Sequence, residues 1–213
     1  MYFNDWFDLI LRKKTPEQLV ASKPVVGEAF KQYLVAMAIV TVITFIELFL
    51  IFGTDFLMEG AAISGIIGLV MGLAGAYLIA WLFHAVTKML GGTGDKNTTI
   101  ASIISLEAAY MGTVGVLGAV IALIAVLVPG LTEILGIWGL IDFLLVLYFL
   151  YLFLSVLKAA HKVDWVKAII ALILTIIVLL VLLTIVAFVI VLIFGAAILT
   201  LLGLSGLPAM PVA

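Results

Sequence analysis

Five apolar stretches, each long enough to cross a lipid bilayer, alternate along this chain with short segments that hold all of its Lys and Arg residues. The hydrocarbon core of a bilayer is about 30 Å thick, which a helix crosses with roughly 20 apolar residues. The predicted spans cover about residues 30–52, 60–83, 99–128, 137–157 and 165–194. The fold class is therefore all-α, a polytopic membrane protein with a five-helix transmembrane domain over residues 29–204.

Composition agrees with a membrane protein and excludes several chemistries. The chain has 213 residues, of which 67% are hydrophobic and 10% charged, whereas soluble domains are about 45–50% apolar and about 25% charged. Lipid must cover the excess apolar surface. With no Cys, the chain has no disulfides, thiolate metal sites or cysteine nucleophiles.

The distribution of the basic residues predicts the orientation. They precede the first span and follow the second and fourth, at Arg12, Lys13, Lys14, Lys23, Lys31, Lys88, Lys96, Lys158, Lys162 and Lys167. Short loops rich in Lys and Arg stay in the cytoplasm. We predict a multi-pass protein of the cell (plasma) membrane with a cytoplasmic N-terminus and an outer C-terminus. A basic rim beside lipid headgroups is ordinary, so nucleic acid binding is not indicated.

Residues 1–28 form a predicted cytoplasmic, amphipathic leader. Residues 1–11 place apolar side chains at helical spacing before three basic residues, which predicts a helix lying in the membrane interface; a disordered tail is the alternative. Thr15, Pro16 and Gln18 fit an N-cap, a first helical position and a third helical position. A second short helix should begin there and end at Lys23-Pro24.

Small residues recur on one face of the second and third spans. Gly65, Gly68, Gly72 and Gly75 are spaced three, four and three apart, and Gly112 and Gly115 belong to a similar face of the third span. Such faces let membrane helices approach closely, although glycine is also generally frequent in membrane helices. We predict a tight hairpin of the second and third spans, and a homo-oligomer through small-residue faces.

The Gly-rich segment 91–98 connects the second and third spans. It superficially resembles a phosphate-binding loop, but it lacks a preceding strand and the Lys-Ser/Thr ending. A flexible connector with Asn97 or Thr98 as the helix N-cap is the better interpretation.

Four polar residues within the spans form a candidate intramembrane site: Glu47, Asp142, Glu107 and His84. Ionisable residues inside a bilayer often mark transport pathways. Glu47 and Asp142 lie about 7–8 Å outward of the midplane at helical rise and could face each other as a proton or cation site. A protonated carboxyl bonded to a neighbouring hydroxyl is the alternative.

Glu107 lies in the inner half of the third span, near His84 and Lys88 at the end of the second. The plain expectation is an ion pair or hydrogen bond that locks the hairpin. His84 and His161 are the only histidines and stand on different segments, and zinc needs three or four ligands. We expect no metal, no cofactor and no catalytic residues.

Several short motifs carry a resemblance to a known family. They are the Thr-Pro-Glu start, residues 26–31, the Gly91–Gly94 connector, residues 137–140 and residues 155–160. Together they resemble prokaryotic, in particular archaeal, members of the Yip1 domain family. The resemblance implies five membrane helices and a cytoplasmic N-terminus. Eukaryotic relatives are linked to Rab GTPases and vesicle traffic, but their Asp-Leu-Tyr-Gly-Pro signature has no counterpart here, so that role is not carried over.

Two functions remain open. The first is a non-enzymatic membrane organiser that recruits a cytoplasmic protein partner through its aromatic, basic leader. The alternative is a small proton- or cation-coupled transporter or channel that uses the intramembrane carboxylates. Five spans without an inverted repeat make a poor substrate path, which favours the organiser. Residues 205–213 are expected to be a flexible outer tail, and whether residues 196–204 re-enter the membrane is left open.

Overall fold

A computed structural model describes residues 7–11, 13–53, 61–131 and 133–201. Within these residues the chain is helical, without strands, and five helices are long and apolar enough to cross a membrane. The predicted fold class is confirmed. The chain divides into two compact units, Met1–Leu172 and Ile173–Ala213.

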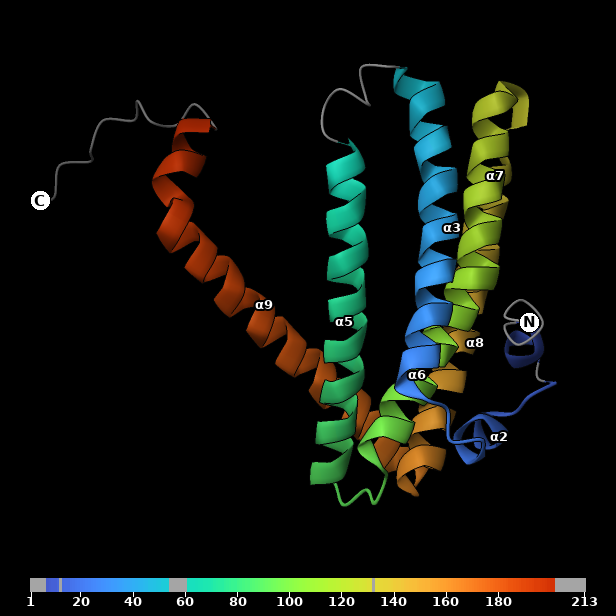
Figure 1. Cartoon of the computed structure of the whole chain (residues 1–213), viewed down its shortest axis with the longest axis vertical. Helices are drawn as coiled ribbons and strands as arrows, with labels where there is room; N and C mark the ends of the chain where they lie inside the picture. Colours follow the sequence, from blue (N-terminus) through green and yellow to red (C-terminus); the bar gives the residue numbers. More distant parts are fainter. Residues whose placement is uncertain (1–6, 12, 54–60, 132, 202–213) are drawn as a thin grey trace, which may run out of the picture. The chain divides into compact units, whose positions relative to one another are not determined.

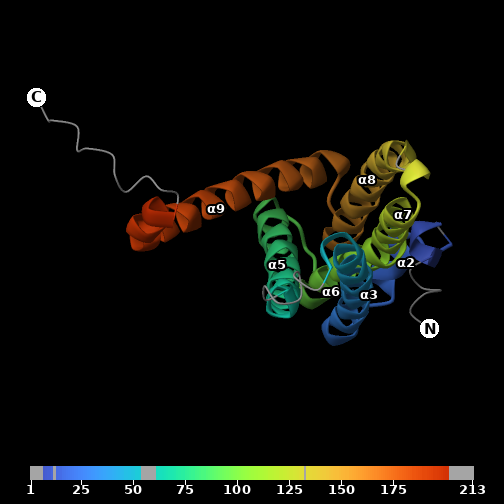
Figure 2. The same cartoon turned by 90° about the horizontal axis from the view of Figure 1, so that it is seen from above.

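The spans of the first unit are α3 (Val26–Phe52), α5 (Ala61–Met89), the pair α6 (Lys96–Tyr110) and α7 (Val116–Leu127), and α8 (Glu133–His161). α6 contacts α3, α5 and α8, so it lies at the centre of the bundle (Figures 1 and 2). A short 3₁₀ turn, η2 (Pro129–Leu131), follows α7. α9 (Trp165–Leu201) begins in the first unit and continues through the second.

The leader helix α2 (Pro16–Ala21) begins as predicted. The Thr15 hydroxyl accepts from the Gln18 backbone N–H at 3.3 Å, and the Gln18 side chain accepts from the Thr15 N–H at 2.9 Å. This reciprocal capping box satisfies two N–H groups that the helix itself cannot pair. Leu19 is buried and anchors α2 in the core cluster. Of the predicted interfacial helix, residues 7–10 are helical, and residues 1–6 lie outside the described part.

Most helices extend beyond the predicted apolar spans. α3 begins at Val26, α5 ends at Met89, α8 covers Glu133–His161, and α9 ends at Leu201. Residues 196–201 therefore continue a helix; residues 202–213, with the predicted tail, lie outside the described part. Helices end where the backbone turns, and not where the side chains become polar. Gly53 ends α3 at a φ of 67°, in the left-handed region that glycine adopts freely.

The third span contains a π-helical turn, η1 (Met111–Gly115), between α6 and α7. Its apolar pattern gave no sign of this turn. A π turn holds one residue more than an α turn, and such bulges occur frequently at functional sites. Thr113 stabilises the turn, because its hydroxyl donates to the carbonyl of Ala109 at 2.6 Å.

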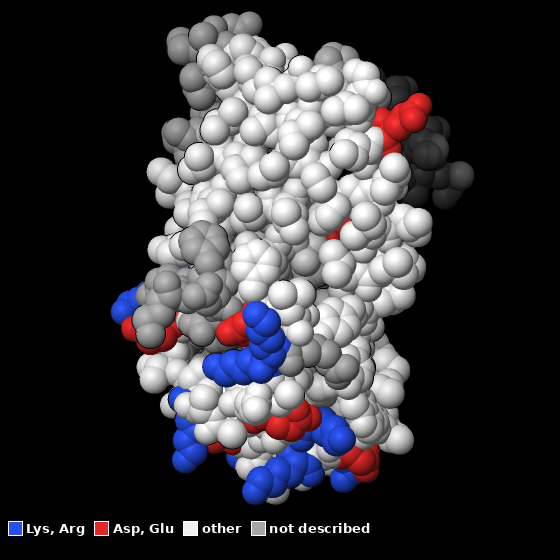
Figure 3. Space-filling view, turned by 90° about the vertical axis from the view of Figure 1, so that its right-hand side faces the viewer, with Lys and Arg blue, Asp and Glu red and all other residues white. Residues whose placement is uncertain are grey.

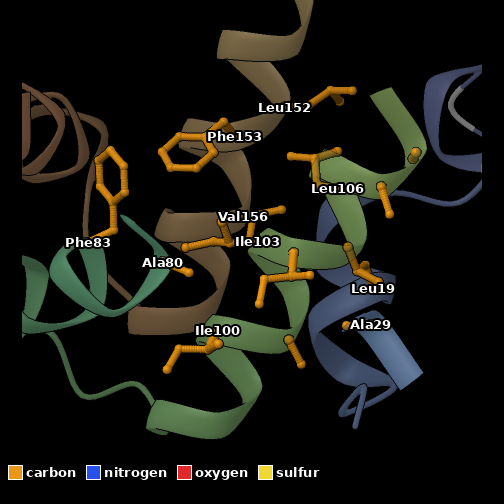
Figure 4. Packing of buried hydrophobic residues seen from close by; sticks show 14 of the residues in the cluster. Leu19, Ala29, Ala80, Phe83, Ile100, Ile103, Leu106, Leu152, Phe153 and Val156 are labelled. Atoms are coloured by element: carbon orange, nitrogen blue, oxygen red, sulfur yellow. The ribbon is translucent and has the colours of Figure 1, made fainter. Parts of the chain in front are cut away.

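The buried core lies towards one end of the first unit, where α2, the start of α3, the end of α5, α6 and the end of α8 meet. Figure 4 shows Leu19 of α2, Phe83 of α5 and Val156 of α8 around Ile103 of α6. Phe83 and Phe153 meet edge to face with ring centroids 4.5 Å apart. The Lys side chains visible in Figure 3 gather at the same end, which we call the Lys-rich end.

In the second unit, the part of α9 from Ile173 onward is apolar on almost every side. Large side chains such as Leu180, Leu183 and Phe188 are more than half exposed. The Thr184 hydroxyl donates to the carbonyl of Leu180 at 2.8 Å, which satisfies this polar group inside a helix that lipid would surround.

Candidate functional site

The Gly-rich segment is fixed to two helices and is not a free connector, which corrects the expectation of a flexible loop. The Gly92 N–H donates to the carbonyl of Thr87 at 3.0 Å, and the Thr93 N–H donates to the carbonyl of His161 at 3.0 Å. These bonds join the ends of α5 and α8 through the loop. A Cβ atom on Gly92 would lie 2.8 Å from the Thr87 carbonyl oxygen and 2.7 Å from His161 Nδ1. Only glycine lets the backbone come this close.

The cap of α6 also differs from the prediction. Asp95 is the N-cap, and its carboxylate accepts from the Thr98 N–H at 2.8 Å. This hydrogen bond to the charged form lowers the pKa of Asp95. Asn97 and Thr98, the predicted N-caps, are residue types that can cap a helix, but the helix already begins at Lys96.

The two histidines lie together although they stand on different segments of the sequence. The rings of His84 and His161 have centroids 5.0 Å apart, and both residues are buried. The Thr99 hydroxyl donates to the Asp95 carbonyl at 2.8 Å and lies 3.2 Å from His161 Nε2. With its hydroxyl proton directed at the Asp95 carbonyl, Thr99 can accept a hydrogen bond from a His161 ring that is protonated on Nε2.

One nitrogen of each ring in this pair has no described partner. His84 Nδ1 and His161 Nδ1 are buried without a hydrogen bond within the part of the chain that the structure describes. Within the same residues, no three His, Cys, Asp or Glu side chains gather as a metal site would need. His161 Nδ1 is packed against the loop glycines, so this ring supports the Gly-rich segment.

The sequence predicted that Glu107 pairs with His84 or Lys88, but the described residues show no such pair. Among the described residues its carboxyl group has no ion pair and no hydrogen bond; it lines a cavity of 370 Å³ together with Tyr33, Gly75, Tyr110 and Phe149. Four helices therefore surround this acid: α3, α5, α6 and α8. The predicted lock of the hairpin is replaced by the bonds of the Gly-rich segment.

Asp142 has a hydroxyl partner. Tyr110 Oη donates to Asp142 Oδ1 at 2.9 Å, which links α6 to α8 inside the bundle. Both residues line a second cavity of 360 Å³ with Thr44 and Trp138. Tyr110 lines the two cavities and stands directly before the π-helical turn. We call Glu107, Tyr110 and Asp142, with the two cavities, the acid–tyrosine site.

Glu47 lies apart from this site. It is partly exposed on α3 and lines neither cavity; Thr44 is the α3 residue that lines the cavity beside Asp142. Within the described residues no hydrogen bond joins Glu47 to Asp142, whose partner is Tyr110. The equal depth predicted for the two carboxyl groups therefore did not bring them together.

The predicted packing glycines meet α3 more than the third span. A Cβ on Gly65 would meet Phe45, one on Gly72 would meet Met37, and one on Gly115 would lie 3.5 Å from Val40. Gly112 is buried in η1, whereas Gly68 and Gly75 have open space where a Cβ would point. The first span thus lies against small residues of both the second and third spans.

Comparison with known protein families gives a match over most of the chain. The model of the Yip1 domain matches residues 14–187, which include α2 and most of the five spans. Comparison with curated proteins found no match, and comparison with solved structures found none.

Proposed function

This chain belongs to the Yip1 domain family, and from that premise we propose that it is a non-enzymatic organiser in the cell membrane, with a cytoplasmic N-terminus. It would recruit a cytoplasmic protein partner to its Lys-rich end. The spans would serve as the frame that holds this end at the membrane surface. Catalysis is not part of the proposed role.

The observation that carries the proposal is the way the leader is held. Leu9 and Leu19 are buried in the core cluster, whereas Phe7 and Leu11 on the same segment are 45% and 61% exposed. Lys13 lies beside them and pairs with Asp8 at 3.8 Å on the surface. A fixed segment that presents apolar and basic side chains suits a protein partner, because little ordering entropy is lost on binding.

A double substitution, Phe7→Ser with Leu11→Ser, tests this role. We expect the variant to keep its thermal stability in detergent but to lose the proteins that crosslink to the wild type in native membranes. Leu9→Ser is the matched control, because it should lower stability instead. An unchanged set of crosslinked proteins in the stable double variant would contradict the organiser role.

Self-association through a small-residue face is a second part of the proposal. Gly68 has open space around its Cβ position, and its neighbours Ile67 and Met71 are exposed. An open glycine on an apolar membrane helix lets a second copy approach closely. Gly68→Leu should reduce the dimer fraction measured by crosslinking in proteoliposomes, and an unchanged fraction would remove this part.

A transporter or channel is the second candidate function, and the acid–tyrosine site favours it. Glu107 lines a cavity without a described partner, and Tyr110 lines both this cavity and the one beside Asp142. Intramembrane carboxyl groups beside cavities are typical of proton and cation pathways. In this role Glu107 and Asp142 would bind the transported ion or proton in turn.

Flux measurements in proteoliposomes test the second candidate. If the wild type carries protons or monovalent cations, Glu107→Gln and Asp142→Asn should abolish the flux, whereas Glu47→Gln should leave it unchanged because Glu47 lines neither cavity. A wild type that carries no ion excludes transport and leaves the organiser role untouched.

A further inference from the structure

Two adjoining pockets at the Lys-rich end share Tyr77 as a lining residue, and we call them the apolar half and the polar half of one groove. The apolar half has a volume of 470 Å³ and lies between Phe30 and Leu34 of α3 and Leu73, Ala74 and Tyr77 of α5. The polar half has a volume of 420 Å³ and is lined by Lys23, Asn97 and Thr98. Tyr77 lines both halves.

The polar half carries donors for an anion. Among the described residues, neither the Lys23 ammonium group nor the Asn97 side chain has a hydrogen bond or ion pair, and both residues are exposed. Lys23 precedes α3 at a φ of 48°. Two carboxylates lie nearby and are engaged: Asp95 accepts from the Thr98 N–H at 2.8 Å, and Glu28 accepts from Lys31 at 2.7 Å.

The apolar half has the opposite character. Phe30 and Tyr77 stack with ring centroids 6.1 Å apart and form one wall, and Leu34 and Tyr77 are 43% and 39% exposed. Lys31 lines this half with its side chain while its ammonium group pairs with Glu28. The groove therefore combines one cationic, hydrogen-bonding end with an apolar slot that runs into the membrane.

An amphiphile with an anionic head matches this combination. A free phosphate or a soluble anion would use Lys23 and leave the slot empty, and a purely apolar ligand would leave Lys23 unused. Lipid surrounds a chain that crosses a bilayer, and an anionic headgroup gains attraction from a nearby Lys. We infer that the groove binds one anionic phospholipid, with its phosphate at Lys23 and Asn97 and one acyl chain between α3 and α5.

The lipid site does not depend on the organiser role or on transport. Its test uses the full chain purified in detergent, with phosphatidylglycerol and phosphatidylcholine of the same acyl chains as probes and glycerol phosphate as the headgroup alone. Native mass spectrometry measures the affinity of each. We expect phosphatidylglycerol to bind most tightly and glycerol phosphate to bind at least a hundredfold more weakly, because it lacks the chain that fills the slot.

Lys23→Gln should lower the affinity for phosphatidylglycerol about fivefold and leave that for phosphatidylcholine unchanged. Lys13→Gln is the matched control, since it removes one charge from the same end without lining the groove. Equal affinities for the two lipids, or an equal effect of both substitutions, would overturn the inference.

Gly27→Leu tests the slot, because Gly27 lines it and has open space where a Cβ would point. The added side chain should occupy the slot and lower phosphatidylglycerol binding at least tenfold. If this variant does not fold, Ala74→Leu fills the slot from α5. Unchanged binding in a folded slot variant would overturn the inference, and tight binding of glycerol phosphate alone would instead indicate a simple phosphate site.

Discussion

The Lys-rich end and the opposite half of the first unit differ sharply in how they are packed. At the Lys-rich end, every residue from Ile100 to Leu106 is buried, and so are Val156 and Leu157. In the opposite half, α3 has no buried residue beyond Ala36, and α7 has only Ala125. The same chain thus builds a dense core at one end and an open bundle at the other.

The contrast follows from the two solvents. Near the membrane surface water is close, so burying apolar side chains gains the full hydrophobic effect. Within the hydrocarbon core, a Leu gains nothing by leaving lipid for protein, and only close van der Waals packing or hydrogen bonds hold helices together. In the opposite half, glycine contacts and the Tyr110–Asp142 hydrogen bond hold the helices together.

A pair of Ile→Ala substitutions tests this contrast most strongly. Ile103 is fully buried in α6, and Ile141 is 43% exposed on α8. Ile103→Ala should lower the free energy of unfolding by about 2–5 kcal/mol because it leaves a cavity, whereas Ile141→Ala should cost less than about 1 kcal/mol. Reversible unfolding in mixed micelles measures both, and equal losses would show that the core is not confined to one end.

The Gly-rich segment gives the next largest effect. In Gly92→Ala, the new Cβ would meet the Thr87 carbonyl oxygen and the His161 ring, so a loss of about 1–3 kcal/mol is expected from overpacking. Gly139→Ala is the control in the opposite half, because Gly139 has open space and lies within a helix. A Gly92→Ala variant as stable as the wild type would mean that the segment moves away from Thr87 and His161 at little cost in free energy.

The glycine face of α5 gives a smaller, position-dependent effect. Gly72→Ala should cost at most about 1 kcal/mol, since the Cβ would lie 2.5 Å from Cε at the flexible end of Met37, which would have to move aside. Gly68→Ala, with open space, should be neutral or slightly stabilising. Thermal unfolding of the monomer in detergent separates the two, and equal effects would contradict the assigned contact with α3.

The cap of α6 gives the smallest effect. Asp95→Ala should lower stability by about 0.5–1 kcal/mol, whereas Asp95→Asn keeps an equivalent cap and should change little. The pKa of Asp95 is lowered in the folded state. The Asp95 carboxylate therefore contributes fully to stability above the pKa that Asp95 has in the unfolded chain. This contribution is lost as the pH falls through the pKa of Asp95 in the folded state. A wild type and an Asp95→Ala variant that lose stability equally on acidification would contradict this assignment.

Features that depend only on residues close together in the chain could be predicted from the sequence. Apolar length identified the five spans, and Thr15, Pro16 and Gln18 identified the start of α2, because capping requires only neighbours in the chain. The positions of the Lys residues predicted that they would share one side of the membrane, and in the structure the Lys side chains visible in Figure 3 gather at one end.

Features that depend on which helices meet escaped prediction. The partner of Asp142 is Tyr110, and the partner of His161 is Thr99; neither follows from spacing, because the side chains come from different spans. Gly65 and Gly72 of α5 meet α3, whereas Gly68 and Gly75 have open space, because a small-residue face in the sequence does not say which helix it meets. A sign for the histidine pair did exist: His84 and His161 both end spans at the same predicted surface.

The π-helical turn has a consequence for how the third span is divided. One surplus residue offsets everything after it by about 100° around the helix axis. Tyr110 can therefore donate a hydrogen bond to Asp142 while Gly118, beyond the turn, still meets the indole of Trp138. Deleting a single residue between Met111 and Gly115 would rotate the second half of this span by about 100° relative to the first half. Gly118 would then no longer face Trp138, so only the observed spacing allows both contacts to form.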